Sequence, residues 1–182
     1  MADGGVELID RAAAAARLPE FRLLLELALT AQTRARATYS GFRVGAAVLG
    51  GSGSAFPGCN VESASYGATI CAERSAVVGA VAAGETAIRA CVVVTPTADP
   101  SSPCGICRQL LAEFGGELLV FAASSASDAV YVARLADLLP LSFGPGNLAG
   151  TAGAAGAAGA ARGTMGAAGD SPRGPADHEA ER

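Results

Sequence analysis

The sequence contains no lysine and only one histidine, and each shortage restricts the chemistry available to the chain. All 13 basic residues are arginines, and 17 acidic residues outnumber them, which gives a formal net charge of −4. A protein that binds the phosphate backbone of nucleic acids needs a basic face, so this function is disfavoured. The histidine, His178, lies far out in a C-terminal segment rich in Gly and Ala. A Ser-His-Asp or Cys-His catalytic centre is therefore excluded unless this residue returns to the domain.

Long apolar runs and an export signal are also missing from the sequence. No apolar segment approaches the roughly 18 residues of a membrane-spanning helix. The first ten residues include acids and lack the continuous apolar core of a secretory signal. An odd number of cysteines in such a chain argues against a disulfide framework. We therefore expect a cytoplasmic protein. Its five cysteines are Cys59, Cys71, Cys91, Cys104 and Cys107.

The first 143 residues have the pattern of one α/β domain. Helical spacing of apolar residues and glycine or proline boundaries predict helices over 6–16, 20–37, 71–84, 103–116 and 135–140. Apolar and β-branched runs predict strands over 43–50, 55–62, 88–96, 117–123 and 129–135. We expect an α/β fold in which helices cover both faces of a mixed five-stranded sheet, a three-layer α/β/α sandwich.

The composition divides the chain into three parts. Residues 1–19 form an N-terminal extension that we expect to be helical, and we expect the main domain to span residues 20–148. Residues 149–182 are mostly Gly and Ala with a polar end. This segment has no apolar period and too little bulky surface to offset the entropy of ordering it. We therefore expect a disordered tail over 149–182.

Cys104 and Cys107 form a C-x-x-C pair directly after Pro103. Such a pair can be a redox couple, a metal site or part of a core. Pro103 favours a helix start, where exposed N–H groups and the positive helix end stabilise thiolates. A thioredoxin-like couple fits poorly, because the pair lies late in the domain and Cys71 opens another helix in the same way.

The helices predicted over 71–84 and 103–116 flank the strand over 88–96 in the sequence. They can therefore pack side by side with their N-termini together. Three thiolates from Cys71, Cys104 and Cys107 could then hold Zn²⁺ and leave a fourth position open, which is the pattern of catalytic zinc sites. Cys91 and Cys59 are interpreted as buried strand residues, with Cys59 near the site.

Glu73 follows Cys71 by two residues, so its carboxylate could face the metal site without being a ligand. There it could take a proton from water and return it elsewhere as a general acid and base. The combination of "CAE" at 71–73 and "PCGIC" at 103–107 matches the pattern of zinc deaminases.

Five motifs together resemble a known family, the short, homotetrameric, three-cysteine cytidine deaminases of pyrimidine salvage. The resemblance covers about residues 20–148 and rests on "YSGFRVGAAV" (39–48), "GCNVESASYG" (58–67), "CAERSAV" (71–77), "PCGICRQ" (103–109) and "LLPLSFGPGNL" (138–148). It implies zinc-dependent hydrolysis of cytidine and 2′-deoxycytidine to uridine and 2′-deoxyuridine, with release of ammonia. It also implies one Zn²⁺ per subunit and a cytoplasmic homotetramer whose sites lie at subunit interfaces. The implied partner is a small nucleoside, not a nucleic acid or a membrane.

The same resemblance implies how a nucleoside is bound. Asn60 and Glu62 correspond to a family pair that hydrogen-bonds the ribose 3′-hydroxyl, and their i, i+2 spacing puts them on one side of a strand. An amide and an acid suit a hydroxyl and would repel a 3′-phosphate. Phe42 corresponds to an aromatic residue that packs against the nucleoside, and Ala72 belongs to the substrate-binding residues.

Three further residues are assigned by the resemblance alone. Phe143 corresponds to the C-terminal phenylalanine that stacks on the base in a neighbouring subunit's site, and Tyr66 falls in a loop that crosses a subunit boundary. Arg74 corresponds to an arginine that hydrogen-bonds the ligand sulfurs. Its charge would offset the net −1 of three thiolates and Zn²⁺.

Three competing functions remain open from the sequence. A deaminase of an antibiotic nucleoside of the blasticidin type would share "CAE" and "PCGxCR", although the Asn60 and Glu62 pair favours cytidine. A polynucleotide deaminase is disfavoured by the acidic, lysine-free composition. A structural zinc module or silent paralogue is disfavoured because Glu73 is present and no fourth protein ligand is evident.

Overall fold

The computed structural model of the 182-residue chain describes residues 5–144 and 147. The tail predicted over 149–182 lies outside these residues. The described elements are β1 (Glu7–Asp10), α1 (Arg11–Arg17), α2 (Phe21–Thr33), β2 (Gly45–Gly50), β3 (Ala55–Cys59), the 3₁₀ turn η1 (Tyr66–Ala68), α3 (Ala72–Ala82), β4 (Ile88–Thr95), α4 (Gly105–Ala112), β5 (Leu119–Ser124), β6 (Ala129–Arg134) and α5 (Leu135–Leu138).

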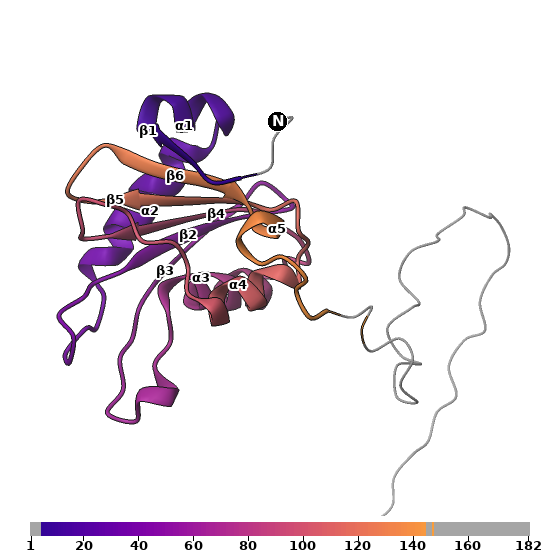
Figure 1. Cartoon of the computed structure of the whole chain (residues 1–182). Coiled ribbons are helices and arrows are strands. Elements are labelled where there is room, and N and C mark those ends of the chain that lie inside the picture. Colours follow the sequence, from indigo (N-terminus) through magenta and orange to yellow (C-terminus); the bar gives the residue numbers. More distant parts are fainter. Residues whose placement is uncertain (1–4, 145–146, 148–182) are drawn as a thin grey trace, which may run out of the picture. The chain divides into compact units, whose positions relative to one another are not determined.

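The strands form one mixed sheet in the order β1-β6-β5-β4-β2-β3. The β4–β5 pair is parallel and the other pairs are antiparallel. The α/β class and the mixed sheet predicted from the sequence are confirmed, but the predicted number of five strands is wrong because β1 adds a sixth beside β6 (Figure 1).

The extra strand comes from residues that the sequence pattern assigned to a helix over 6–16. Glu7 pairs with Val132 and Ile9 with Val130, and Ile9 packs against the core while Leu8 faces outward. This alternation is that of a strand, but four residues are too few to reveal a period of two. Asp10 then begins α1, since its carboxylate accepts a hydrogen bond from the Ala13 amide at 2.7 Å.

Alternate residues of the central strand β4 belong to two different buried clusters. Val92 and Val94 of β4 belong to a buried cluster with residues of α1 and α2. Cys91 and Val93 belong to the opposite cluster, with residues of α3 and α4. Cys91 is fully buried, as predicted for a core residue. In Figure 1, α3 and α4 accordingly lie side by side below the sheet.

Two glycines let helices approach the sheet closely. A Cβ at Gly45 in β2 would collide with the Ala28 carbonyl oxygen of α2. A Cβ at Gly58 in β3 would collide with the Ala72 carbonyl oxygen and the Ala76 amide of α3. The first turn of α3 therefore lies directly against the backbone of β3, which fixes the position of that turn.

The helices are short and end at recognisable signals. Gly84 adopts φ +99° and terminates α3 as predicted, with Gly84 and Glu85 amides bonded to the Val81 and Ala80 carbonyl oxygens. The longest described helix, α2, has 13 residues. Among the described residues, no helix combines the length and apolar character required to cross a bilayer.

Candidate metal centre and adjoining pocket

The thiols of Cys71, Cys104 and Cys107 converge at one point. The Cys71 and Cys104 sulfurs lie 3.8 Å apart and the Cys104 and Cys107 sulfurs 3.5 Å apart, and all three lie within 4.8 Å of one another. Sulfurs bound tetrahedrally to Zn²⁺ at about 2.3 Å are about 3.8 Å apart. The three thiols therefore fit one zinc ion and leave one coordination position for a non-protein ligand.

Two helix starts place these thiols. Cys71 is the N-cap of α3 and Cys104 is the N-cap of α4, and neither side chain forms a capping hydrogen bond. Their sulfurs therefore remain available for a metal while lying at the positive ends of two helices. Cys107 follows in the first turn of α4, on the same side as Cys104. The sequence predicted that Pro103 lies in the first turn of this helix. In the structure Pro103 stands one position before the N-cap, Cys104.

The surroundings of the thiols shift the pKa values of Cys71 and Cys107 in opposite directions. Hydrogen bonding from Cys107, assisted by Cys104 and the positive charge of Arg74, lowers the pKa of Cys71 to about 6. The hydrogen bond to Cys71 and burial raise the pKa of Cys107. A metal ion displaces the protons of the thiols that it binds, so it would be bound more tightly as the pH rises.

Glu73 lies in the first turn of α3, and its side chain is only 5% exposed. Burial, and to a smaller extent the charge of Cys71, raises the pKa of its carboxyl group. A carboxyl group with a raised pKa can accept and donate a proton near neutral pH. The described residues provide no basic partner that would hold Glu73 in an ion pair.

A cavity of about 340 Å³ opens beside the thiols. Seven of the residues predicted for the site line it, namely Phe42, Asn60, Glu62, Cys71, Ala72, Glu73 and Cys104. The structure also adds wall residues that the sequence reasoning missed, namely Ser40, Val44, Thr69, Val93, Thr95, Ser101 and Ser102. Several of these lie next to the recognised motifs, and "PSSPC" before Cys104 is the signal that could have indicated the two serines.

Asn60 and Glu62 both face this cavity, although β3 ends at Cys59 and not at residue 62 as predicted. Asn60 Oδ1 accepts a hydrogen bond from the Val44 amide at 2.8 Å, and its Nδ2 donates one to the Phe42 carbonyl oxygen at 2.9 Å. Asn60 therefore holds the segment that presents Phe42. One Nδ2 hydrogen remains for a ligand.

The Glu62 carboxylate is bound to the turn at residues 39 and 40. It accepts hydrogen bonds from the Tyr39 amide at 2.7 Å, from the Ser40 amide at 3.2 Å and from the Ser40 hydroxyl. The Ser40 hydroxyl and the Tyr39 amide are the main causes that lower the pKa of Glu62. An ionised carboxylate with a remaining lone pair thus faces the cavity.

Tyr66 and Phe143 do not reach this cavity within the described chain. Tyr66 lies on η1 with 76% of its side chain exposed, stacked edge-on against Tyr39 at 6.1 Å. It lines a neighbouring cavity of about 380 Å³ that shares Ser40, Glu62 and Thr69 with the first. Phe143 is 59% exposed, and its carbonyl oxygen accepts a hydrogen bond from Gln109. Their predicted roles across a subunit boundary stay predictions.

Two arginines support the thiols from outside the cavity. Arg74 donates to the Thr69 carbonyl oxygen at 3.4 Å, and its positive charge contributes to the lowered pKa of Cys71. Its predicted hydrogen bond to the ligand sulfurs stays a prediction. Arg108, which the sequence reasoning missed, donates to the Pro103 carbonyl oxygen at 2.7 Å, the Leu138 carbonyl oxygen at 2.9 Å and the Ser102 hydroxyl at 2.6 Å. It therefore ties the backbone before Cys104 to the end of α5.

Comparisons with known proteins agree with this geometry. The family model "Cytidine and deoxycytidylate deaminase zinc-binding region" matches residues 20–123. A cytidine deaminase of Mycobacterium tuberculosis is 40% identical over 130 residues, which are 71% of this chain and 93% of that protein. One of Sporosarcina psychrophila is 41% identical over 120 residues, 65% of this chain and 88% of that protein.

A crystal structure of cytidine deaminase from Burkholderia pseudomallei is similar to the fold, with a TM-score of 0.64 and 45% identity. The match covers 67% of this chain and 98% of that one. The chain therefore belongs to the zinc-binding cytidine and deoxycytidylate deaminase family, which confirms the enzyme family and the zinc site predicted from its sequence.

Proposed function

We propose that the protein hydrolyses cytidine and 2′-deoxycytidine to uridine and 2′-deoxyuridine, with release of ammonia, in pyrimidine salvage. One observation carries this proposal. The buried carboxyl group of Glu73 lines a single cavity together with Cys71 and Cys104 of the metal site and with Asn60 and Glu62. A nucleoside carries a reacting amino group on its base and hydroxyl groups on its ribose, and one cavity lined by both sets of residues can bind both parts.

At the metal end, Zn²⁺ held by Cys71, Cys104 and Cys107 would supply Lewis-acid activation of a water. Glu73 moves the protons. It accepts one from the attacking water and delivers it to N3 of the pyrimidine as the new C4–O bond forms. It then transfers the remaining hydroxyl proton to the amino group, so that the C4–N bond breaks and ammonia leaves. Its burial, which raises its pKa, supports this exchange of protons in both directions.

At the ribose end, Glu62 accepts a hydrogen bond from the 3′-hydroxyl, and the free Nδ2 hydrogen of Asn60 donates one to the same oxygen. Phe42, Val44 and Ala72 line the cavity and provide apolar contacts for the nucleoside. Because the pKa of Glu62 is lowered, its carboxylate is ionised at neutral pH and repels a 3′-phosphate. This charge favours a nucleoside over a polynucleotide substrate.

We further propose a cytoplasmic homotetramer with a catalytic domain over 20–148 and helices on both faces of its sheet. Exposed aromatic side chains outside the cavity, those of Tyr66 and Phe143, support an assembly in which they complete a neighbouring subunit's site. The free thiols support a reducing compartment.

The decisive experiment is an absorbance assay of the zinc-loaded protein with cytidine. Conversion to uridine lowers the ultraviolet absorbance, and stoichiometric ammonia release should accompany it. Removal of zinc by a chelator should abolish turnover, and re-addition should restore it. 2′-Deoxycytidine should be converted as well.

Two parallel substrates separate the competing functions. Faster deamination of blasticidin S than of cytidine would reassign the site to antibiotic nucleosides. Deamination of single-stranded DNA would assign it to polynucleotides. A folded, zinc-loaded protein that turns over none of these substrates would refute the enzymatic proposal.

A further inference from the structure

The loop over 96–104 carries one zinc ligand and part of the cavity wall. It connects β4 to α4, and its Ser101, Ser102 and Cys104 all line the cavity. Thr95 at the end of β4 lines it too, and its hydroxyl accepts a hydrogen bond from the Ser101 amide at 3.1 Å. The geometry of this wall thus depends on how the loop is held.

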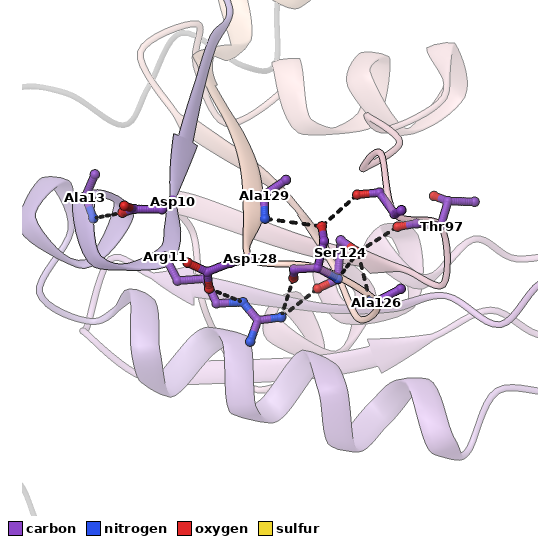
Figure 2. A network of polar contacts seen from close by, with 10 residues as sticks. Asp10, Arg11, Ala13, Thr97, Ser124, Ala126, Asp128 and Ala129 are labelled. Atoms are coloured by element: carbon purple, nitrogen blue, oxygen red, sulfur yellow. Dashed lines mark hydrogen bonds and ion pairs between the residues drawn. The ribbon is translucent and has the colours of Figure 1, made fainter.

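A turn between β5 and β6 holds the loop from behind. The fully buried Ser124 donates its hydroxyl to the Thr97 carbonyl oxygen at 2.6 Å, and Ser127 donates to the Ala98 carbonyl oxygen at 2.7 Å. The Ser124 hydroxyl also accepts hydrogen bonds from the Ala126 and Ser127 amides, each at 2.9 Å (Figure 2). One side chain therefore fixes both the turn and the loop.

The Arg11 side chain binds the same turn through its backbone carbonyl oxygens and Asp128. Its Nη2 donates to the Ser124 carbonyl oxygen at 2.7 Å and to the Ser127 carbonyl oxygen at 3.1 Å, and its Nε lies 3.5 Å from Asp128 Oδ1. Figure 2 shows the guanidinium beneath the turn, with Ser124 between it and Thr97. Hydrogen bonds from a charged donor are stronger than neutral ones.

The backbone segment that carries Arg11 is itself held in place by the sheet and the core. Arg11 begins α1, directly after β1, which is paired with β6, and Ala14 of α1 is fully buried in the core. A continuous series of hydrogen bonds therefore runs from the N-terminal segment to the cavity. It passes from Arg11 to the 124–128 turn, then to Thr97, whose hydroxyl lies 3.2 Å from that of Thr95, and ends at the Ser101 amide.

We propose that Arg11 is a positioning residue that holds the 96–104 loop, and with it the cavity wall and Cys104, in the geometry needed for activity. Arg11 touches neither the thiols nor the cavity, so it acts through the turn. The role assigns a function at the active site to residues 7–17, which precede the part of the chain matched by the family model.

The first test is hydrogen exchange in the zinc-loaded full-length protein. Arg11→Gln should accelerate exchange in peptides covering residues 96–104 by about tenfold, because the charge-assisted hydrogen bonds to the turn are lost. Exchange in α2 should stay at the wild-type rate. The matched control is Arg17→Gln, which removes another arginine of α1, one that pairs with Glu7 at 2.6 Å within the N-terminal segment. It should leave the 96–104 loop unchanged.

Steady-state kinetics give the second readout, and this part alone rests on the proposed function. Arg11→Gln should lower kcat/KM for cytidine by about tenfold at a temperature where the variant is folded. Arg11→Lys, which keeps a charge beside Asp128 but cannot bridge two carbonyl oxygens from one planar group, should recover part of the loss.

The outcomes separate the two proposals. Wild-type exchange in the 96–104 peptides of Arg11→Gln would overturn the positioning role, as would equal acceleration in all peptides or in both arginine variants. A wild-type protein without cytidine turnover would overturn the proposed function only, because the exchange measurement would still decide the role of Arg11.

Discussion

Arg108 donates its Nε hydrogen to the carbonyl oxygen of Pro103 at 2.7 Å, directly before the backbone of Cys104. Two other contacts of the same guanidinium, to Ser102 and Leu138, fix the approach to this ligand. The backbone before Cys104 is therefore held by a side chain that does not bond to the thiols and reaches the cavity wall only through Ser102.

Replacing Arg108 by Gln should weaken zinc binding by about tenfold, because three hydrogen bonds that order the Cys104 backbone are lost. Competition with a chromogenic chelator measures this change. Arg89→Gln is the control, since Arg89 forms a partly exposed pair with Glu20 at 3.8 Å and lies at the start of β4, whereas Thr95 at the other end of β4 lines the cavity. Equal zinc affinity in the two variants would contradict the role given to Arg108.

Glu73→Gln should retain zinc and lose turnover by about 10²- to 10⁴-fold, since an amide cannot shuttle protons. Metal analysis and the cytidine assay measure the two properties on the same sample. The amide has nearly the volume of the carboxyl group, so the buried position should stay filled and the protein folded. Substantial activity in this variant would remove Glu73 from the mechanism.

Glu62→Gln should raise KM for cytidine by about tenfold or more and change kcat less, because the lost contact is to the ribose and not to the reacting base. The variant should also discriminate less than the wild type between cytidine and 3′-deoxycytidine, which lacks the hydroxyl. The same preference for cytidine in both proteins would show that Glu62 does not contact this group.

The contact between Ser40 and Glu62 predicts a dependence of stability on pH. A carboxyl group whose pKa is lowered in the folded state stabilises the protein above its unfolded pKa, and this contribution is lost as the pH falls through the folded pKa. Ser40→Ala should therefore lower Tm near pH 7, and its difference from the wild type should shrink in acid.

Melting curves at several pH values measure the Ser40 effect. Ser52→Ala removes a similar hydroxyl contact, to Glu85, outside the cavity. It should show the same pH trend in stability without a change in KM, whereas Ser40→Ala should raise KM. A constant Tm difference between Ser40→Ala and the wild type across the pH range would contradict the prediction.

The close approach of β3 to α3 predicts opposite effects for two glycine substitutions. Gly58→Ala should destabilise the protein by about 1–3 kcal/mol, because its Cβ would displace the first turn of α3 and with it Cys71. A Cβ at Gly79 of α3 would meet open space. Gly79→Ala should therefore stabilise the protein by about 0.5–1 kcal/mol. Denaturant unfolding measures both, and a stabilising Gly58→Ala would refute the packing argument.

The sequence predicted which thiols meet at the metal site because their positions depend on local spacing. Cys71, Glu73, Cys104 and Cys107 lie at helix starts, and a helix start is indicated by a few neighbouring residues. The fold class followed in the same way from alternating apolar segments.

Contacts between segments far apart in the chain were not predictable in this way. Arg108 meets Leu138, and Arg11 meets Ser124, across 30 and 113 residues. An arginine on a helix surface has the same sequence pattern whether it contacts solvent or a distant carbonyl oxygen. Strand β1 was missed for a related reason. Its four residues could equally form a helical turn, and only their pairing with β6 makes them a strand.

The position of β1 also bears on how the protein behaves at high concentration. An open strand edge offers unpaired N–H and C=O groups on which another chain can add and start aggregation. Here β1 covers β6 and leaves an outer edge of four residues that includes the acids Glu7 and Asp10. At the opposite edge, β3 contains Pro57, which has no N–H to donate. Both margins of the sheet are thus poor templates for intermolecular strand addition, which favours solubility of a chain rich in apolar residues.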